Sequence, residues 1–227
     1  MRHRSHARNG GERMSKADEV YNVVIERLTT ARYAFGDRLL VKELGAETGA
    51  SRQPIMAALN RLSAEGFVQI IPQVGCQVID PAKNEISDFF QMFQRMEGLL
   101  AELAARRRTE DDLHILRRTQ QRLRDLDRTS ENASRDYTLL NQEFHQAMHR
   151  AAHSPLLDEK QRKNFLMIDF FITHSVGFGA FMDDAVREHD QIIDAIEKRQ
   201  TERARLEAES HIAAIASSVL GGLEIEG

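Results

Sequence analysis

The chain has 227 residues, of which 41% are hydrophobic and 29% charged, a composition that excludes an intrinsically disordered protein. No apolar run approaches the roughly 20 residues that a membrane-spanning helix needs. The single cysteine, Cys76, excludes an internal disulfide framework and fits the reducing cytoplasm, where we expect the protein. The net charge of −4 is unevenly distributed, since residues 1–80 hold 11 Lys and Arg against 9 Asp and Glu, and residues 81–227 hold 20 against 26.

The first segment, residues 1–14, is polar and has no apolar periodicity, so we predict a disordered arm. The chain then takes the spacing of an amphipathic helix, with Ser15 as its N-cap. The inward positions of this helix are Val20, Val23, Val24 and Leu28.

Two further helices are predicted after a turn at Phe35-Gly36-Asp37. The second is short and ends at Gly49, which suits a positive φ. Its predicted inward side chains are Leu40, Leu44 and Ala46. The third is capped by Ser51 and runs to about Glu65. Its buried stripe comprises Ile55, Ala58, Leu59 and Leu62.

The period changes after Gly66. Residues 67–71 and 76–79 have strand character, and Pro72-Gln73-Val74-Gly75 is a turn between them. Three helices followed by a two-stranded wing predict a winged helix-turn-helix domain over residues 15–80.

DNA binding follows from this arrangement, because the leading turn of a recognition helix faces the base edges of the major groove. Ser51 is expected at a phosphate, Arg52 at guanine or a phosphate, and Gln53 at adenine, with Met56 in the same exposed turn. Two further contacts are predicted outside that helix. They are Lys42 at a phosphate and Gly75 of the wing at the minor groove.

This part of the chain resembles the GntR family of regulators. The resemblance rests on Phe35 to Leu39, on Ser51-Arg52-Gln53-Pro54-Ile55 at the third helix, and on Pro72 to Gly75. The family usually has Ser-Arg-Thr-Pro and a second arginine at the third helix, where this chain has Gln53 and Met56.

Everything after Pro81 is predicted to be helical, forming an all-α bundle over residues 81–227. The fold class is therefore mainly α. The predicted helices cover 83–107, 109–128, 132–152, 155–176, 180–198 and 200–220.

A metal site is predicted within this bundle. Asn141 and His145 share a helix face, and His189 and His211 lie on the apolar faces of two later helices. Imidazole ligands suit zinc or nickel, and open coordination positions would accept a small carboxylate. Glu143 and Glu188 are adjacent to histidines in sequence, and helix geometry directs them to other faces. His149, His153 and His174 are not expected to be ligands.

The bundle resembles the FCD ligand-binding domain of the FadR-type GntR subfamily. The match covers the first helix, from Phe90 through Glu97 to Ala104-Ala105, and then Phe144-His145, Glu188-His189 and His211. The resemblance implies a divalent metal at these histidines. Two residues depart from the family pattern, Asn141 in place of an aspartate and Phe93 in place of an arginine.

These features are compatible with three functions. The favoured one is a homodimeric transcription regulator that binds an imperfect palindromic operator and responds to a small organic acid. The family resemblance implies a repressor whose repression is relieved by the ligand. A metalloenzyme is the second, although no nucleophile is paired with a general base. In the third, the helical domain serves only for dimerisation and its histidines are buried core residues.

Overall fold

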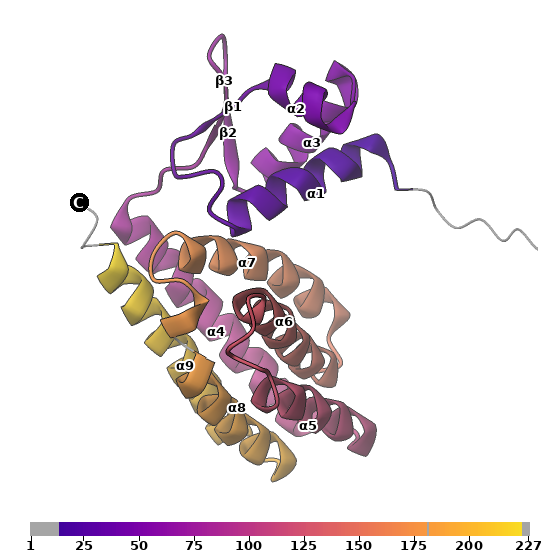
Figure 1. The fold of residues 1–227 in the computed structure, drawn as a ribbon. Helices are drawn as coiled ribbons and strands as arrows, with labels where there is room; N and C mark the ends of the chain where they lie inside the picture. The colour runs from indigo at the N-terminus through magenta and orange to yellow at the C-terminus, as the bar shows by residue number, and fades with distance from the viewer. Residues whose placement is uncertain (1–13, 181, 224–227) are drawn as a thin grey trace, which may run out of the picture. The chain divides into compact units, whose positions relative to one another are not determined.

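The computed structural model describes residues 14–180 and 182–223 (Figure 1). The predicted arm therefore lies outside the described residues, apart from Met14. The chain divides into two compact units. Unit 1 contains the residues up to Arg27 together with Gly36–Ile79, and unit 2 contains Leu28–Phe35 together with the chain from Asp80 onward.

Unit 1 contains three helices and a small antiparallel sheet. The elements are α1 (Lys16–Thr29, whose last residues belong to unit 2), β1 (Arg38–Leu39), α2 (Val41–Thr48), α3 (Arg52–Ala64), β2 (Val68–Ile71) and β3 (Gly75–Val78). The strand order is β1-β3-β2, with Leu39 opposite Cys76 and Val68 opposite Val78. The predicted winged helix-turn-helix fold is confirmed.

The two helix boundaries around α2 and α3 follow from local chemistry. Gly49 adopts the left-handed conformation at φ 65° and donates its backbone N–H to Gly45, which ends α2. Ser51 occupies the N-cap position of α3 as predicted, but its hydroxyl makes no capping hydrogen bond. The expected inner stripe of α3, from Ile55 to Leu62, is fully buried.

Part of the prediction for α2 was wrong. Leu40 is half exposed and Ala46 is exposed, whereas Leu44 is buried as predicted. The reason is the two-residue strand β1, which the sequence analysis missed. Leu39 points into the core from this strand, so the apolar period of the helix starts later than expected.

Unit 2 is a bundle of helices with no strand among its described residues. Its elements are α4 (Lys83–Arg107), α5 (Glu110–Arg124), α6 (Ala133–Ala151), α7 (Pro155–Thr173), the short 3₁₀ helix η1 (Phe178–Ala180), α8 (Met182–Glu197) and α9 (Thr201–Gly222). The 25-residue α4 is the central helix, packing most extensively along α9 and also contacting α6, α7 and α8 (Figure 1).

The segment Leu28–Phe35 is held by α7 within unit 2. The Phe35 ring meets Phe170 edge to face, with centroids 5.1 Å apart. The hydroxyl of Thr173 donates to the carbonyl of Thr29 at 3.2 Å. The His174 ring lies 2.6 Å from the Tyr33 carbonyl oxygen through Nε2. Consequently α7 anchors the backbone between α1 and β1.

Candidate DNA-binding surface and metal centre

The residues predicted to contact DNA gather at the surface of unit 1. Ser51, Arg52 and Gln53 are exposed at the start of α3, and Met56 is partly buried one turn later. Lys42 is exposed on α2. Within the described part of the chain neither Lys42 nor Arg52 has an ion-pair partner, so both cations are available to phosphates or base edges.

Another arginine of unit 1 has a structural role instead. Arg61, near the end of α3, pairs with Glu65 and lies 3.6 Å over the Tyr21 ring. Tyr21 in turn donates its hydroxyl to Glu65 at 2.6 Å. This cluster joins α1 to α3 and leaves the first turn of α3 free of such contacts.

The wing is a hairpin whose turn needs glycine. Gly75 has a φ of 124°, a region that residues with a side chain rarely adopt, and it is exposed. Val74 beside it is also exposed. The neighbouring Cys76 is buried, and burial raises the pKa of its thiol to about 11. Cys76 therefore behaves as a small core residue.

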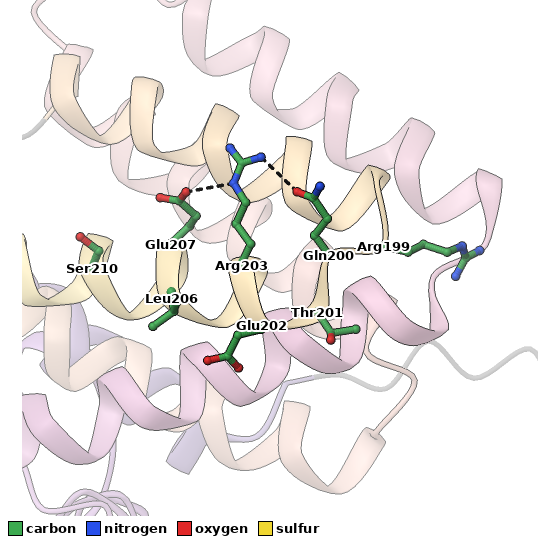
Figure 2. Close-up of a pocket in the computed structure, with 8 residues that line it drawn as sticks. All are labelled: Arg199, Gln200, Thr201, Glu202, Arg203, Leu206, Glu207 and Ser210. Carbon is green, nitrogen blue, oxygen red and sulfur yellow. Dashed lines mark hydrogen bonds and ion pairs between the residues drawn. The ribbon is translucent and has the colours of Figure 1, made fainter.

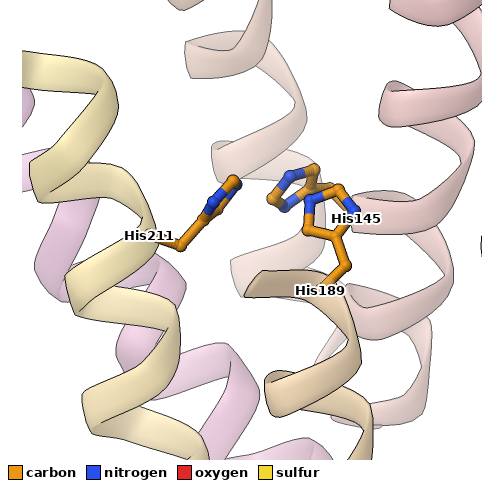
Figure 3. A group of neighbouring side chains, drawn as sticks. All are labelled: His145, His189 and His211. Atoms are coloured by element: carbon orange, nitrogen blue, oxygen red, sulfur yellow. The ribbon is translucent and has the colours of Figure 1, made fainter. Parts of the chain in front are cut away.

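Unit 2 brings three histidines together from three helices. His145 of α6, His189 of α8 and His211 of α9 are each almost completely buried, and one ring nitrogen of each lies within 4.8 Å of the others (Figure 3). The ring centroids are 4.8–5.4 Å apart. Helical spacing is sufficient to direct all three side chains into one core.

Several polar atoms at this cluster lack a hydrogen-bond partner among the described residues. They are both ring nitrogens of His189, Nε2 of His211 and Oδ1 of Asn141, which lies one turn before His145 on α6. Burying such an atom unpaired costs about 1–3 kcal/mol. A cation coordinated by one nitrogen of His189, by Nε2 of His211 and by this oxygen reduces that cost, so the residues present fit a divalent metal.

The electrostatics of the cluster also suit metal ligands. Burial lowers the pKa of His145 to about 4, against the opposing effect of the Glu97 carboxylate. Burial, with His211 and His145 nearby, also lowers the pKa of His189 well below its usual range. Both rings are therefore neutral at pH 7, which leaves a lone pair for a cation.

A buried carboxylate outside the predicted set of metal ligands lies next to His145. Glu97 of α4 is completely buried, and its carboxylate accepts hydrogen bonds from His145, His149 and Gln161 at 2.7–2.9 Å. Burial alone raises the pKa of Glu97, but the His149 ring and the two histidine hydrogen bonds hold it well below its usual range. In the sequence, the only sign of this arrangement is that His149 follows His145 by four residues, which places both rings on the same face of α6.

One expectation about the flanking carboxylates was wrong. Glu188 does not point away from the cluster, because its carboxylate lies 2.6 Å from Nδ1 of His211 on the neighbouring helix. Glu143 does behave as expected, since it is exposed and pairs with Arg122. Glu188, although it is adjacent to His189 on α8, thus contacts a different histidine of the cluster, His211 on α9.

Phe93, one of the two residues that depart from the family pattern, packs against another aromatic side chain. Phe93 is fully buried and meets Phe165 edge to face at 5.1 Å. Phe165 lies 4.7 Å from the His145 ring. This side of the cluster is therefore apolar.

A wide surface pocket lies along α9 but does not reach the histidines. Figure 2 shows its lining, in which Arg203 pairs with Glu207 and with Gln200. The pocket residues occupy the outer face of α9, whereas Ala208 and His211 occupy the buried face. This pocket is therefore separate from the histidine cluster and is not part of the candidate metal site.

Asp169 of α7 is a second buried carboxylate, and it gives a pH-dependent prediction. Burial raises the pKa of Asp169 to about 7, although a hydrogen bond from Gln142 opposes the shift. The folded state then binds a proton that the unfolded state releases above about pH 4, so stability falls as pH rises toward 7. Asp169→Asn removes this effect. Between pH 5 and pH 8 we expect the variant to gain about 2–3 kcal/mol relative to the unmutated protein.

Urea denaturation at the two pH values measures this difference. The buried histidines are common to both proteins and cancel in the comparison. Asp127→Asn is a control. The hydroxyl and backbone N–H of Thr129 lower the pKa of the exposed Asp127 carboxyl, so this group does not titrate between pH 5 and pH 8. A stability gap between Asp169→Asn and the unmutated protein that is equal at both pH values would contradict the assignment.

Comparison with known proteins identifies the family. The model of the bacterial regulatory proteins of the gntR family matches residues 16–78, and the FCD domain model matches residues 88–214. The chain belongs to the GntR family. Because this is a family of DNA-binding transcription regulators, the chain is a regulator and not an enzyme. Its FCD domain corresponds to the FadR-type subfamily.

Individual relatives of this GntR regulator agree with that conclusion. It is 22% identical over 200 residues to the uncharacterized HTH-type transcriptional regulator YdhC of Bacillus subtilis, covering 85% of this chain and 86% of YdhC. It is 25% identical over 203 residues to the HTH-type transcriptional repressor RspR of Escherichia coli, covering 88% and 87%. The solved structure of E. coli McbR/YncC has the same fold, with a TM-score of 0.73 at 18% identity, over 94% of this chain and 99% of that one.

No helix in the described parts of this regulator combines the length and the apolar character needed to cross a membrane.

Proposed function

We propose that this GntR-family regulator is a homodimeric repressor that binds an imperfect palindromic operator. Its affinity for the operator is controlled by a small carboxylate bound at a metal in the FCD domain. Residues 15–80 serve DNA binding in this proposal, and residues 81–227 serve ligand binding and dimerisation. A two-fold dimer matches a palindrome because each α3 reads one half-site.

In the DNA-binding part, Arg52 and Gln53 read bases from the first turn of α3, Ser51 binds a phosphate, and Met56 contacts the DNA from the same turn. Lys42 binds a phosphate, and Gly75 lets the wing backbone approach the minor groove. The assignment is supported by the exposure of all of these residues except the partly buried Met56, and by the lack of an ion-pair partner for Lys42 and Arg52 among the described residues.

In the FCD domain, Asn141, His145, His189 and His211 hold the metal, for which zinc and nickel are the best candidates. The observation that carries this proposal is the burial of both His189 nitrogens without any hydrogen-bond partner among the described residues. A bound divalent ion supplies a Lewis acid with open positions for carboxylate oxygens. The neutral imidazoles orient that ion, and Phe93 and Phe165 keep one side of it apolar.

The alternative of a purely structural FCD domain predicts different chemistry. Core histidines that serve packing are normally hydrogen-bonded, whereas His189 has no such partner within residues 14–180 and 182–223. A small carboxylate regulates DNA binding only if it binds one arrangement of the DNA-binding units better than another.

The test uses untagged full-length protein and duplexes that it selects from a random DNA pool. Operator affinity is measured at fixed salt by fluorescence anisotropy, with zinc or nickel and a panel of mono- and dicarboxylates. We expect at least one acid to change the dissociation constant by roughly 5–150-fold, the usual range of allosteric coupling. Sedimentation should give twice the mass of the chain.

Two outcomes would overturn the proposal. One is a protein whose melting temperature does not respond to either metal, since a ligand that binds only the folded state must raise it. The other is operator affinity that stays constant across the whole panel of acids with the metal bound.

A further inference from the structure

Two histidines of the cluster share a feature that the third lacks. Nδ1 of His145 lies 2.9 Å from the Glu97 carboxylate, and Nδ1 of His211 lies 2.6 Å from the Glu188 carboxylate. An ionised carboxylate can only accept a hydrogen bond, so in each ring Nδ1 is the nitrogen that carries a proton when the ring serves as a metal ligand. The lone pair of each ring is then on Nε2, the nitrogen available to a cation.

We propose that Glu97 and Glu188 are positioning residues of the metal site, which orient His145 and His211 and supply the negative charge that Asn141 does not. This inference rests on the metal site of the proposed function and extends it to residues outside the ligand set. Carboxylates behind histidine ligands fix the tautomer and raise the basicity of the ring.

Glu97 is itself held rigidly. Its Oε1 accepts hydrogen bonds from His149 of α6 at 2.7 Å and from Gln161 of α7 at 2.8 Å, while Oε2 accepts from His145. Donors on two helices thus fix a carboxylate of a third. Because Glu97 cannot turn away, the ring plane of His145 is fixed before any ion binds.

The charge balance explains why two carboxylates are needed. The four proposed ligands are all neutral, and a divalent cation among them would be buried with two uncompensated charges. Transfer of an unpaired ion out of water is strongly unfavourable even after the protein relaxes around it. Glu97 and Glu188 together carry two negative charges, each one hydrogen bond behind a ligand, so the site with its ion is neutral overall.

A second metal ion at Glu97, His145 and His149 is the competing interpretation, since these three groups also lie within 4.8 Å of one another. The ring nitrogens that face Glu97 are, however, already in direct hydrogen bonds of 2.7–2.9 Å with its oxygens. Among the described residues, the cluster of three histidines has three unpaired ring nitrogens, two on His189 and one on His211, whereas the unpaired nitrogen of His149 is Nδ1, which is not the nitrogen that faces Glu97. We therefore assign Glu97 and His149 to the support of the first site.

The test measures zinc affinity of full-length Glu97→Gln and Glu188→Gln by competition with a chromophoric chelator, and records the visible spectrum of the cobalt forms. We expect each variant to bind zinc 10–100-fold more weakly, the usual effect of losing a carboxylate behind a ligand. The matched control is Glu143→Gln, the same change at an exposed glutamate that pairs with Arg122. Its zinc affinity should stay within two-fold of the unmutated protein.

A second substitution tests whether the loss of zinc affinity comes from the lost negative charge or from general damage to the fold. Asn141→Asp returns one negative charge to the site, so in the Glu188→Gln background it should recover at least part of the lost affinity. Glu188 is partly exposed, so this pair of variants remains informative even if the fully buried Glu97→Gln unfolds. The melting temperature of the metal-free Glu188→Gln protein checks its fold.

The outcomes are distinguishable. Zinc affinities of both glutamine variants equal to that of the unmutated protein would overturn this inference alone, as would an Asn141→Asp substitution that recovers nothing. An unmutated protein that binds no divalent metal would overturn the proposed site itself, and this inference with it.

Discussion

Replacing His189 by glutamine is expected to abolish zinc binding while leaving operator binding by the metal-free protein largely intact. The His189 ring is completely buried, is stacked 3.9 Å from Phe144, and has no hydrogen-bond partner among the described residues. Loss of a direct ligand should exceed the 10–100-fold effect of losing a carboxylate behind a ligand. Glutamine is preferred to alanine because it leaves a smaller cavity beside Phe144.

Metal content of the untagged protein and calorimetric titration with zinc measure this effect. His114→Gln is the matched control, since His114 is an exposed histidine on α5. Full metal retention by His189→Gln would remove His189 from the ligand set. Loss of operator binding together with a lowered melting temperature would show instead that the substitution disrupts the fold.

Replacing Arg52 by alanine is expected to weaken operator binding by roughly 1–3 kcal/mol, or about 5–150-fold, if the guanidinium contacts a base. Arg52 is exposed in the first turn of α3 and has no ion-pair partner in the described part of the chain, so its removal should not affect folding. Affinity for unrelated DNA should fall less, because non-specific binding depends on phosphate contacts in general.

Anisotropy titrations with operator and scrambled duplexes at the same salt concentration make this comparison. Arg187→Ala, which removes an exposed arginine on α8, should bind both duplexes normally. A uniform loss on both duplexes would reassign Arg52 to a phosphate. Unchanged operator affinity would remove it from the interface.

Helices with a long apolar period could be predicted closely from the sequence. α4 begins and ends at the predicted residues 83 and 107. Predictions failed where the signal was short or local. The two residues of β1 are too few for any periodicity, and α5 and α7 end three or four residues before their predicted ends, at Arg124 and Thr173.

The candidate metal centre was predictable only in part. Apolar helix faces direct His145, His189 and His211 toward the core, and that pattern is readable in the chain. The carboxylates behind them are not, because Glu97 and Glu188 contact histidines on other helices, 48 and 23 residues away. Such pairs depend on how the helices pack, and helix periodicity carries no information about packing partners.

The hold of α7 on the segment Leu28–Phe35 has a mechanical consequence. A 19-residue helix is a stiff rod of about 28 Å, with Gln161 in its first half and Phe170 near its far end. Gln161 of α7 donates to Glu97, and His174, directly after α7, lies 2.6 Å from the Tyr33 carbonyl oxygen, so one end of this rod contacts the buried carboxylate and the other contacts the segment Leu28–Phe35. The backbone position at Tyr33 is therefore set inside unit 2, three residues before the chain enters unit 1 at Gly36.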